Sequence, residues 1–266
     1  MKGLLDKLML MENLSPLEAT TAMETLMTGQ ATPAQIASFL TALRMKGETV
    51  EEISAFAQVL RGRAHRVRTT RPTIDIVGTG GDGTNTFNIS TAAAFVTAAA
   101  GMPVAKHGNR AASSRCGTAD VLEALGVNIT LSPERAAACL EETGICFLFA
   151  QAYHESMRHV AQTRREMGVR TVFNLIGPLS NPAFVEHQLL GVPTDKLVVP
   201  MARVLAKLGM KHAMAVHGED GPDEMTIGGS TPPTAQHAGT AAAAAAAARP
   251  SSASALGAPN TRGSSA

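Results

Sequence analysis

The chain has 266 residues, with 23 basic and 22 acidic side chains and a net charge of +1. This near-neutral balance argues against a nucleic acid or an anionic membrane as a partner. The length suffices for one large domain or two modest ones. Three cysteines are too few for a disulfide framework, so we expect a reducing, cytoplasmic location.

The first 65 residues are predicted to form helices. Ser15, Thr32 and Thr49 each stand three positions before Glu or Gln, which is the spacing of a capping box. Apolar residues recur at helical spacing after these starts. We therefore expect a helical domain over residues 1–65. The basic run 61–71 that closes it suits a solvated linker better than a nucleic-acid contact.

From Thr73 the pattern changes to short apolar runs that alternate with helical segments. The runs predict strands at 74–77, 103–106, 146–150, 188–192 and 213–217, and the segments predict helices at 90–100, 118–125, 133–142, 155–167 and 195–208. This alternation indicates an α/β domain with a mostly parallel sheet, over residues 73–227. Ligands of such sheets bind beyond the carboxyl ends of the strands.

The composition changes after about Gly228. Residues 228–266 are rich in Ala, Ser, Gly and Pro and include an unbroken Ala241–Ala248. This composition buries too little apolar surface to offset chain entropy, so we expect a disordered, low-complexity tail. The α/β domain is then expected to be incomplete at its carboxyl-terminal end.

A glycine-rich segment, 78–91, follows the first predicted strand and leads into a helix. Three of its glycines match the G-x-G-x-x-G pattern of dinucleotide-binding loops, but a polar stretch separates them from the helix. No Gly-Lys-Ser/Thr follows, as a P-loop would require. Glycine N–H groups and the side chains of Asn88, Ser90 and Thr91 at a helix N-terminus favour anions. We therefore predict a cradle for phosphate or pyrophosphate.

A basic segment follows the second predicted strand. It contains Lys106, His107, Asn109 and Arg110, and small hydroxyl residues continue it to Thr118. Two permanent cations among small polar residues suit a multiply charged phosphate. His107 could act as a general base or only donate a hydrogen bond, and the sequence leaves both open.

Two further positions bear on the chemistry. Asp223 and Glu224 follow the last predicted strand, and adjacent carboxylates near phosphate loops favour Mg²⁺ over a simple acidic turn. Arg164 lies on a predicted helix, where it could be solvent-exposed or could hold a planar carboxylate through two hydrogen bonds. The sequence leaves both roles open for Arg164.

Together these motifs resemble the anthranilate phosphoribosyltransferase family. The resemblance runs from about residue 3 to about 227 and rests on residues 78–82, 88–91, 106–110, 172–179 and 223–224. It implies a small helical domain joined to a larger α/β domain, homodimers and a role in tryptophan biosynthesis. The implied reaction transfers phosphoribose from phosphoribosyl pyrophosphate (PRPP) to the amino group of anthranilate, with Mg²⁺, and releases pyrophosphate.

The resemblance also implies roles for individual residues. The implied catalytic residues are Lys106, His107 and Asn109. The implied PRPP site consists of Gly78, Gly81, Asp82, Thr86, Asn88, Ile89, Ser90, Thr91, Lys106, His107, Gly108, Asn109, Arg110, Ala111, Ala112, Ser113, Ser114 and Thr118. Anthranilate would contact Gly78, Asn109 and Arg164, and Mg²⁺ would be held by Ser90, Asp223 and Glu224. Neither a covalent intermediate nor an obligatory general base is expected.

The sequence departs from the family pattern at Pro222, where Leu is usual, at Cys116, where Ser is usual, and in the tail. Two alternatives stay open. A pyrimidine nucleoside phosphorylase of the same fold would need Ser-Thr-Gly-Gly after Lys106 and His107, which this chain lacks. The other alternative is an inactive, non-enzymatic product whose α/β domain is incomplete.

Overall fold

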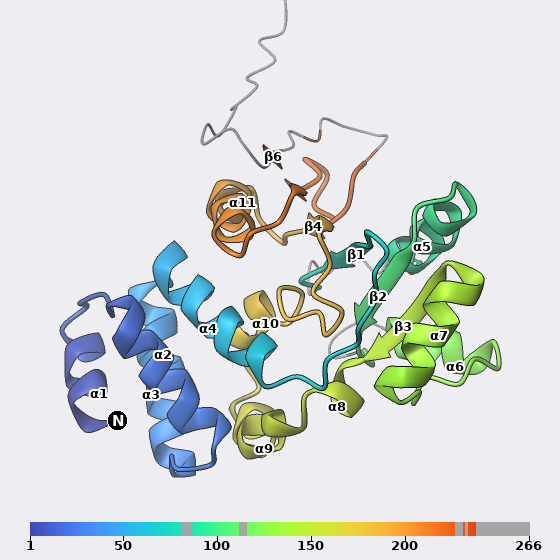
Figure 1. Cartoon of the computed structure of the whole chain (residues 1–266). Coiled ribbons are helices and arrows are strands. Elements are labelled where there is room, and N and C mark those ends of the chain that lie inside the picture. The colour runs from blue at the N-terminus through green and yellow to red at the C-terminus, as the bar shows by residue number, and fades with distance from the viewer. Residues whose placement is uncertain (81–86, 112–115, 227–230, 232–233, 238–266) are drawn as a thin grey trace, which may run out of the picture.

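The computed structural model describes residues 1–80, 87–111, 116–226, 231 and 234–237. Its amino-terminal part is a bundle of four helices (Figure 1): α1 (Lys2–Met9), α2 (Pro16–Met27), α3 (Pro33–Lys46) and α4 (Val50–Gly62). All three predicted capping boxes are present, because the side chains of Ser15, Thr32 and Thr49 each accept a backbone N–H three residues later. The start of each of these helices is therefore fixed by local sequence.

A buried carboxylate joins the ends of these helices. Glu52 is fully buried, and its Oε1 accepts the Leu14 N–H at 2.8 Å. Its Oε2 accepts the Thr49 N–H at 2.8 Å and forms an ion pair with Lys46 Nζ at 2.9 Å. Three donors, one of them cationic, offset the cost of burying this charge.

The second part is built on a six-stranded sheet. Its strands are β1 (Ile74–Gly78), β2 (Val104–Gly108), β3 (Ile145–Phe149), β4 (His187–Gly191), β5 (His212–Val216) and β6 (Thr234–His237), in the order β3-β2-β1-β4-β5-β6. The first five strands are parallel, which confirms the predicted α/β class. β6 pairs antiparallel with β5.

β6 corrects the expectation for the tail, because it lies within the segment 228–266 that was predicted to have no regular structure. Its four residues form no apolar run. The backbone groups along the edge of β5 supply its pairing, so the strand depends on an existing sheet rather than on its own composition.

Helices cover the sheet and connect it to the bundle (Figure 1). They are α5 (Ile89–Ala99), α6 (Thr118–Ala124), α7 (Pro133–Thr143), α8 (Ala150–Tyr153), α9 (Arg158–Met167), α10 (Val172–Ile176) and α11 (Val198–Lys207), with 3₁₀ turns at Glu155–Met157 and Asp195–Leu197. α5 packs on β1 and β2, and α7 packs on β3. α11 packs on β5 and on α4, while α9 and α10 pack on the bundle. None of the helices in the described part of the chain has the length and apolarity to span a bilayer.

The order of the strands locates a binding crevice. From β1 the chain proceeds to β2 and β3 on one side, and later to β4 and β5 on the other. The carboxyl ends of β1 and β4 are thus the point at which the winding direction of the sheet changes. Ligands of open α/β sheets bind at this point. The two strands end in register at Gly78 and Gly191.

Candidate active site

A cavity of about 370 Å³ opens at the carboxyl edge of the sheet. Most of the predicted site residues line it: Gly78, Asn88, Ile89, Ser90, Lys106, His107, Gly108, Asn109, Arg110, Ala111, Thr118, Arg164, Asp223 and Glu224. Thr91 is buried, with its Oγ1 3.3 Å from Thr118 Oγ1. The predicted Gly81, Asp82, Thr86, Ala112, Ser113 and Ser114 lie outside the described residues. The fold thus brings four distant segments of the chain to one site.

Asp223 occupies the crevice between β1 and β4. It is 8% exposed, and its Oδ2 accepts the Gly80 N–H at 2.7 Å. A Cβ added at Gly78 would lie 2.3 Å from Asp223 Oδ2, and one added at Gly191 would lie 1.6 Å from the Asp223 carbonyl oxygen. The carboxylate reaches this position only because both strands end in glycine.

Lys106 is the central cation of the cavity. It is 3% exposed, and its Nζ donates to the Ile76 carbonyl at 2.6 Å and to Ser90 Oγ at 3.3 Å. Burial lowers the pKa of Lys106, and the carboxylates of Asp75 and Glu224 oppose that shift. The ammonium group lies near the N-terminus of α5, where backbone N–H groups also favour an anion.

Of the three predicted metal residues, two interact with this cation and the third lines the same cavity. Ser90 Oγ contacts Lys106 Nζ, and the charge of Glu224 acts on the same ammonium. Asp223 lies in the crevice between β1 and β4 and lines the same cavity. Two carboxylates and a hydroxyl are hard oxygen ligands, which suit Mg²⁺ completed by water and substrate phosphates. These residues therefore fit the predicted ion.

Arg164 faces the cavity from α9, so the solvent-exposed alternative does not hold. Its guanidinium lies 4.8 Å from the centre of the Phe173 ring, and burial lowers its pKa. Stacking on an aromatic face orients the planar group and leaves its edge for hydrogen bonds. The edge of the guanidinium can donate two parallel hydrogen bonds to one carboxylate.

His107 is buried on β2, and its Nε2 has no hydrogen-bond partner among the described residues. Its ring lies 5.1 Å from that of His154. Burial, with a smaller contribution from His154, holds the pKa of His107 well below its usual range. His107 is therefore neutral at neutral pH and offers a hydrogen bond rather than a charge.

Arg110 lines the cavity, but its guanidinium also has partners within the protein. It forms ion pairs with Asp120 at 3.1 Å and with Glu123 at 2.7 Å, both on α6. Asp120 in turn accepts the N–H groups of Ala111 and Gly117 at 2.9 Å. The structure thus gives Arg110 a second role, because it ties the basic segment to α6.

The sequence analysis missed two charged residues at this site. Arg170 donates to the carbonyl oxygens of Gly80 and Thr79, and so holds the start of the glycine-rich segment. Asp75 is fully buried on β1, accepts the His107 N–H at 3.3 Å, and has a pKa raised by burial to about 6. The signal for Asp75 was an acid inside an otherwise apolar strand.

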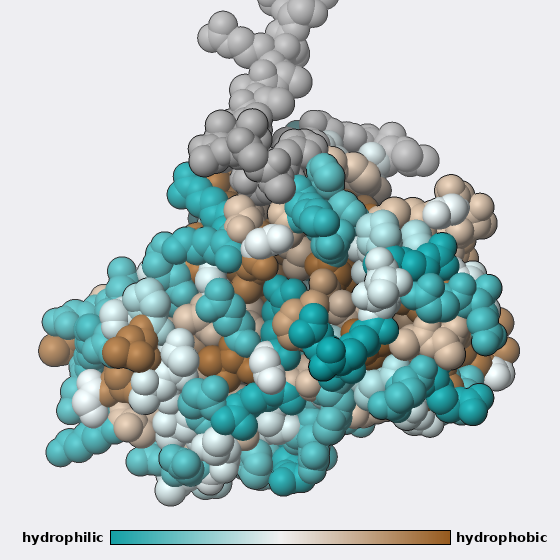
Figure 2. All heavy atoms as spheres, in the orientation of Figure 1, coloured by the Kyte–Doolittle hydropathy of each residue, from teal (hydrophilic) through white to brown (hydrophobic). Residues whose placement is uncertain are grey.

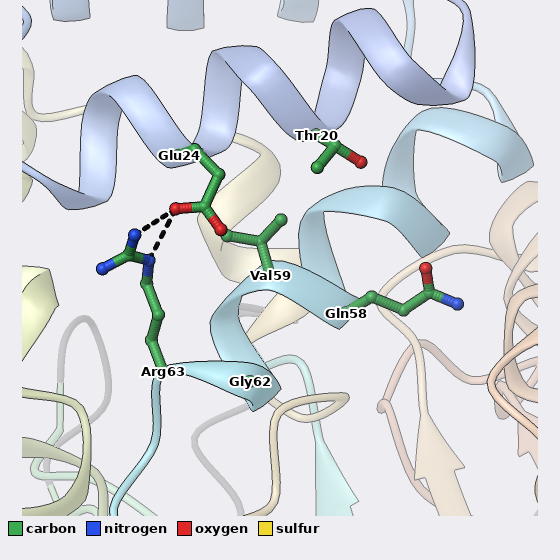
Figure 3. Close-up of a pocket in the computed structure, with 6 residues that line it drawn as sticks. All are labelled: Thr20, Glu24, Gln58, Val59, Gly62 and Arg63. Carbon is green, nitrogen blue, oxygen red and sulfur yellow. Dashed lines mark hydrogen bonds and ion pairs between the residues drawn. The ribbon is translucent and has the colours of Figure 1, made fainter.

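A second depression lies between α2 and α4, away from the sheet (Figure 3). It is lined by Thr20, Glu24, Gln58, Val59, Gly62 and Arg63. The guanidinium of Arg63 forms an ion pair with the carboxylate of Glu24, so the two charges of this depression neutralise each other. This depression therefore offers no unpaired charge of the kind that the cavity at the sheet edge carries.

Known proteins with this architecture define the class. Residues 2–64 match a family model described as "Glycosyl transferase family, helical bundle domain". Residues 70–251 match "Glycosyl transferase family, a/b domain". The chain thus matches both domains of a glycosyl transferase family, a helical bundle followed by an a/b domain.

Individual relatives narrow this class. An anthranilate phosphoribosyltransferase from Symbiobacterium thermophilum is 56% identical over 232 residues, which are 87% of this chain and 68% of that protein. One from Thermomicrobium roseum is 59% identical over 218 residues, which are 80% of this chain and 62% of that protein. The chain belongs to the anthranilate phosphoribosyltransferase family.

Solved structures agree with this assignment. The anthranilate phosphoribosyltransferase of Thermus thermophilus has a TM-score of 0.82 and 48% identity, covering 87% of this chain and 70% of that one. The enzyme of Saccharomyces cerevisiae, in complex with PRPP and Mg, has a TM-score of 0.75 and 31% identity, covering 84% and 66%. The chain thus spans between 62% and 70% of the length of these four relatives.

Proposed function

We propose that this chain transfers the phosphoribosyl group of PRPP to the amino group of anthranilate and releases pyrophosphate. The observation that carries the proposal is the meeting of Lys106, Arg164 and Asp223 at one cavity on the winding switch of the sheet. Family membership supports the reaction, and the yeast relative whose structure holds PRPP and Mg supports the substrate and the ion.

The phosphate groups of PRPP would be held between the N-terminus of α5 and the basic segment after β2. Negative charge grows on the pyrophosphate as it leaves the anomeric carbon. Lys106 Nζ, which is buried, and the backbone N–H groups near Asn88 stabilise that charge. Mg²⁺, held by Ser90, Asp223 and Glu224, would supply further neutralisation of the phosphates when bound.

Anthranilate would lie on the opposite wall of the cavity. Arg164 orients its carboxylate, and Asn109 and Gly78 line the path to the reacting carbon. Because the amine is itself a nucleophile, positioning accounts for much of the rate. The neutral His107 contributes a hydrogen bond, and no side chain is assigned as an obligatory base.

We further propose a cytoplasmic homodimer that serves tryptophan biosynthesis. The free thiols of Cys116, Cys139 and Cys146 fit a reducing compartment. Figure 2 shows brown, hydrophobic patches among hydrophilic residues on the side of the bundle. The exposed large apolar side chains of the bundle are Met9, Leu10, Met11, Leu17 and Met45. A second copy of the chain would cover this patch.

One assay tests the reaction. Purified protein is mixed with Mg²⁺, PRPP and anthranilate, and the loss of anthranilate fluorescence is followed. Turnover that requires all three components supports the proposal. Folded protein without turnover refutes it for this chain, and phosphate-dependent cleavage of thymidine instead would assign a nucleoside phosphorylase.

A further inference from the structure

Histidines occupy one cross-strand row of the sheet, at the edge opposite the substrate cavity. His187 begins β4 and His212 begins β5, and the two are direct partners in the parallel register. The antiparallel pairing of β6 sets the backbone of His237 opposite that of His212. The side chains of His187 and His212, which are paired across neighbouring strands, point to the same face and lie close enough to interact.

The rings of His187 and His212 are already arranged as two ligands of one ion would be. Their Nδ1 atoms are 3.1 Å apart, and the rings stack with centroids at 5.0 Å and an angle of 22° between planes. Two nitrogens at about 2.0–2.1 Å from a tetrahedral ion stand about 3.3 Å apart. Little movement of the rings is needed to admit a metal between the two Nδ1 atoms.

The charges beside the pair balance each other. Beside the pair, Lys211 Nζ and Glu186 Oε1 form an ion pair at 2.8 Å. These two charges offset each other and leave no strong net field against a cation.

The pair lies at the surface, because His212 is exposed and His187 is half-buried. The pair begins its strands, while the cavity lies at their carboxyl ends. Gly191 lies four positions after His187, which is about 13 Å along a strand. The pair is therefore separate from the substrate cavity.

We propose that His187 and His212 form a binding site for a borderline transition-metal ion such as Zn²⁺, Ni²⁺ or Cu²⁺. The ion takes the place of the proton that one Nδ1 now shares with the other. That histidine then carries its proton on Nε2, so each Nδ1 can present a lone pair to the ion. Imidazole ligands distinguish this site from the oxygen site near Lys106, which suits Mg²⁺.

The test uses the full chain without a polyhistidine tag, stripped of metal. Isothermal titration with ZnCl₂ should show one equivalent bound in wild type. His187→Asn and His212→Asn should each weaken binding at least tenfold. His65→Asn, which changes an exposed histidine in the linker after α4, should leave the affinity unchanged. Circular dichroism checks that each variant is folded.

A second measurement needs no variant. The electron paramagnetic resonance spectrum of the protein with one equivalent of Cu²⁺ should show splitting from at least two imidazole nitrogens. Binding that persists unchanged in both asparagine variants would overturn the proposal. So would a Cu²⁺ spectrum without imidazole nitrogens.

Discussion

Replacement of Gly191 by Ala should displace the acidic turn that carries Asp223. The added Cβ would lie 1.6 Å from the Asp223 carbonyl oxygen and 2.7 Å from its carbonyl carbon, whereas ordinary contacts begin near 3.4 Å. The turn must therefore move by nearly 2 Å, because backbone cannot rotate aside as a side chain can. Such overpacking costs about 1–3 kcal/mol of stability. A misplacement of about 1 Å at a reacting site costs roughly 100-fold in rate.

Two other glycines allow a comparison, Gly78 as a milder clash and Gly62 as a control. At Gly78 the added Cβ meets Asp223 Oδ2 at 2.3 Å, so the clash is with a side chain. Gly78→Ala should lose less stability than Gly191→Ala while still weakening Mg²⁺-dependent binding of PRPP. At Gly62, the last residue of α4, no atom lies within 4 Å, so Ala should be neutral or stabilise by about 0.5–1 kcal/mol.

The assays are thermal unfolding, titration calorimetry of PRPP with Mg²⁺, and anthranilate fluorescence. Gly191→Ala should lower the melting temperature and weaken PRPP binding, whereas Gly62→Ala should do neither. A Gly191→Ala protein with the melting temperature and PRPP affinity of wild type would refute the placement of Asp223 against the end of β4.

Three further predictions follow from the site. Asp223→Asn should lower Mg²⁺-dependent turnover by well over tenfold, and an unchanged rate at any Mg²⁺ concentration would remove this acid from the site. Arg164→Lys should raise the KM for anthranilate at least tenfold while that for PRPP changes little, because an ammonium lacks the two-bond edge; the exposed neighbour Arg165→Lys is the control, and equal effects would contradict the assignment. Burial raises the pKa of Asp75 from 3.8 to about 6, so its protonated form favours folding, and on the order of 3 kcal/mol of stability is lost as pH rises from 4 through 6. The stability of wild type relative to Asp75→Asn, from urea unfolding, should fall over that range, and a difference independent of pH would contradict it.

The predictable part of the fold is the part with local signals. The five parallel strands are apolar runs bounded by polar or glycine residues, and each was placed to within a residue of its observed start. α8 and α10 have four and five residues, too few for helical periodicity to show. The helix expected over 155–167 begins as a 3₁₀ turn and becomes α9 at Arg158.

The site was predictable as a set of residues but not as an arrangement. Motif spacing indicated which loops bind phosphate and metal. It gave no distance between Asp223 and Gly80, which are 143 positions apart in the chain and joined by one hydrogen bond. The same holds for Asp75 and Asn181, which are 106 positions apart. Contacts of this kind arise from strand order, which no local pattern encodes.

Glu52 links the stability of the bundle to the shape of the active site. One carboxylate fixes the loop before α2, the end of α3 and the start of α4. These segments are therefore expected to move as one rigid body. α3 packs on α9, which carries Arg164, and α3 and α4 both pack on α10, which carries Phe173. A change in the bundle should therefore tilt, as a unit, the wall of the cavity that is proposed to hold anthranilate. Substitutions far from any substrate would then alter selectivity for the acceptor before they alter affinity for PRPP.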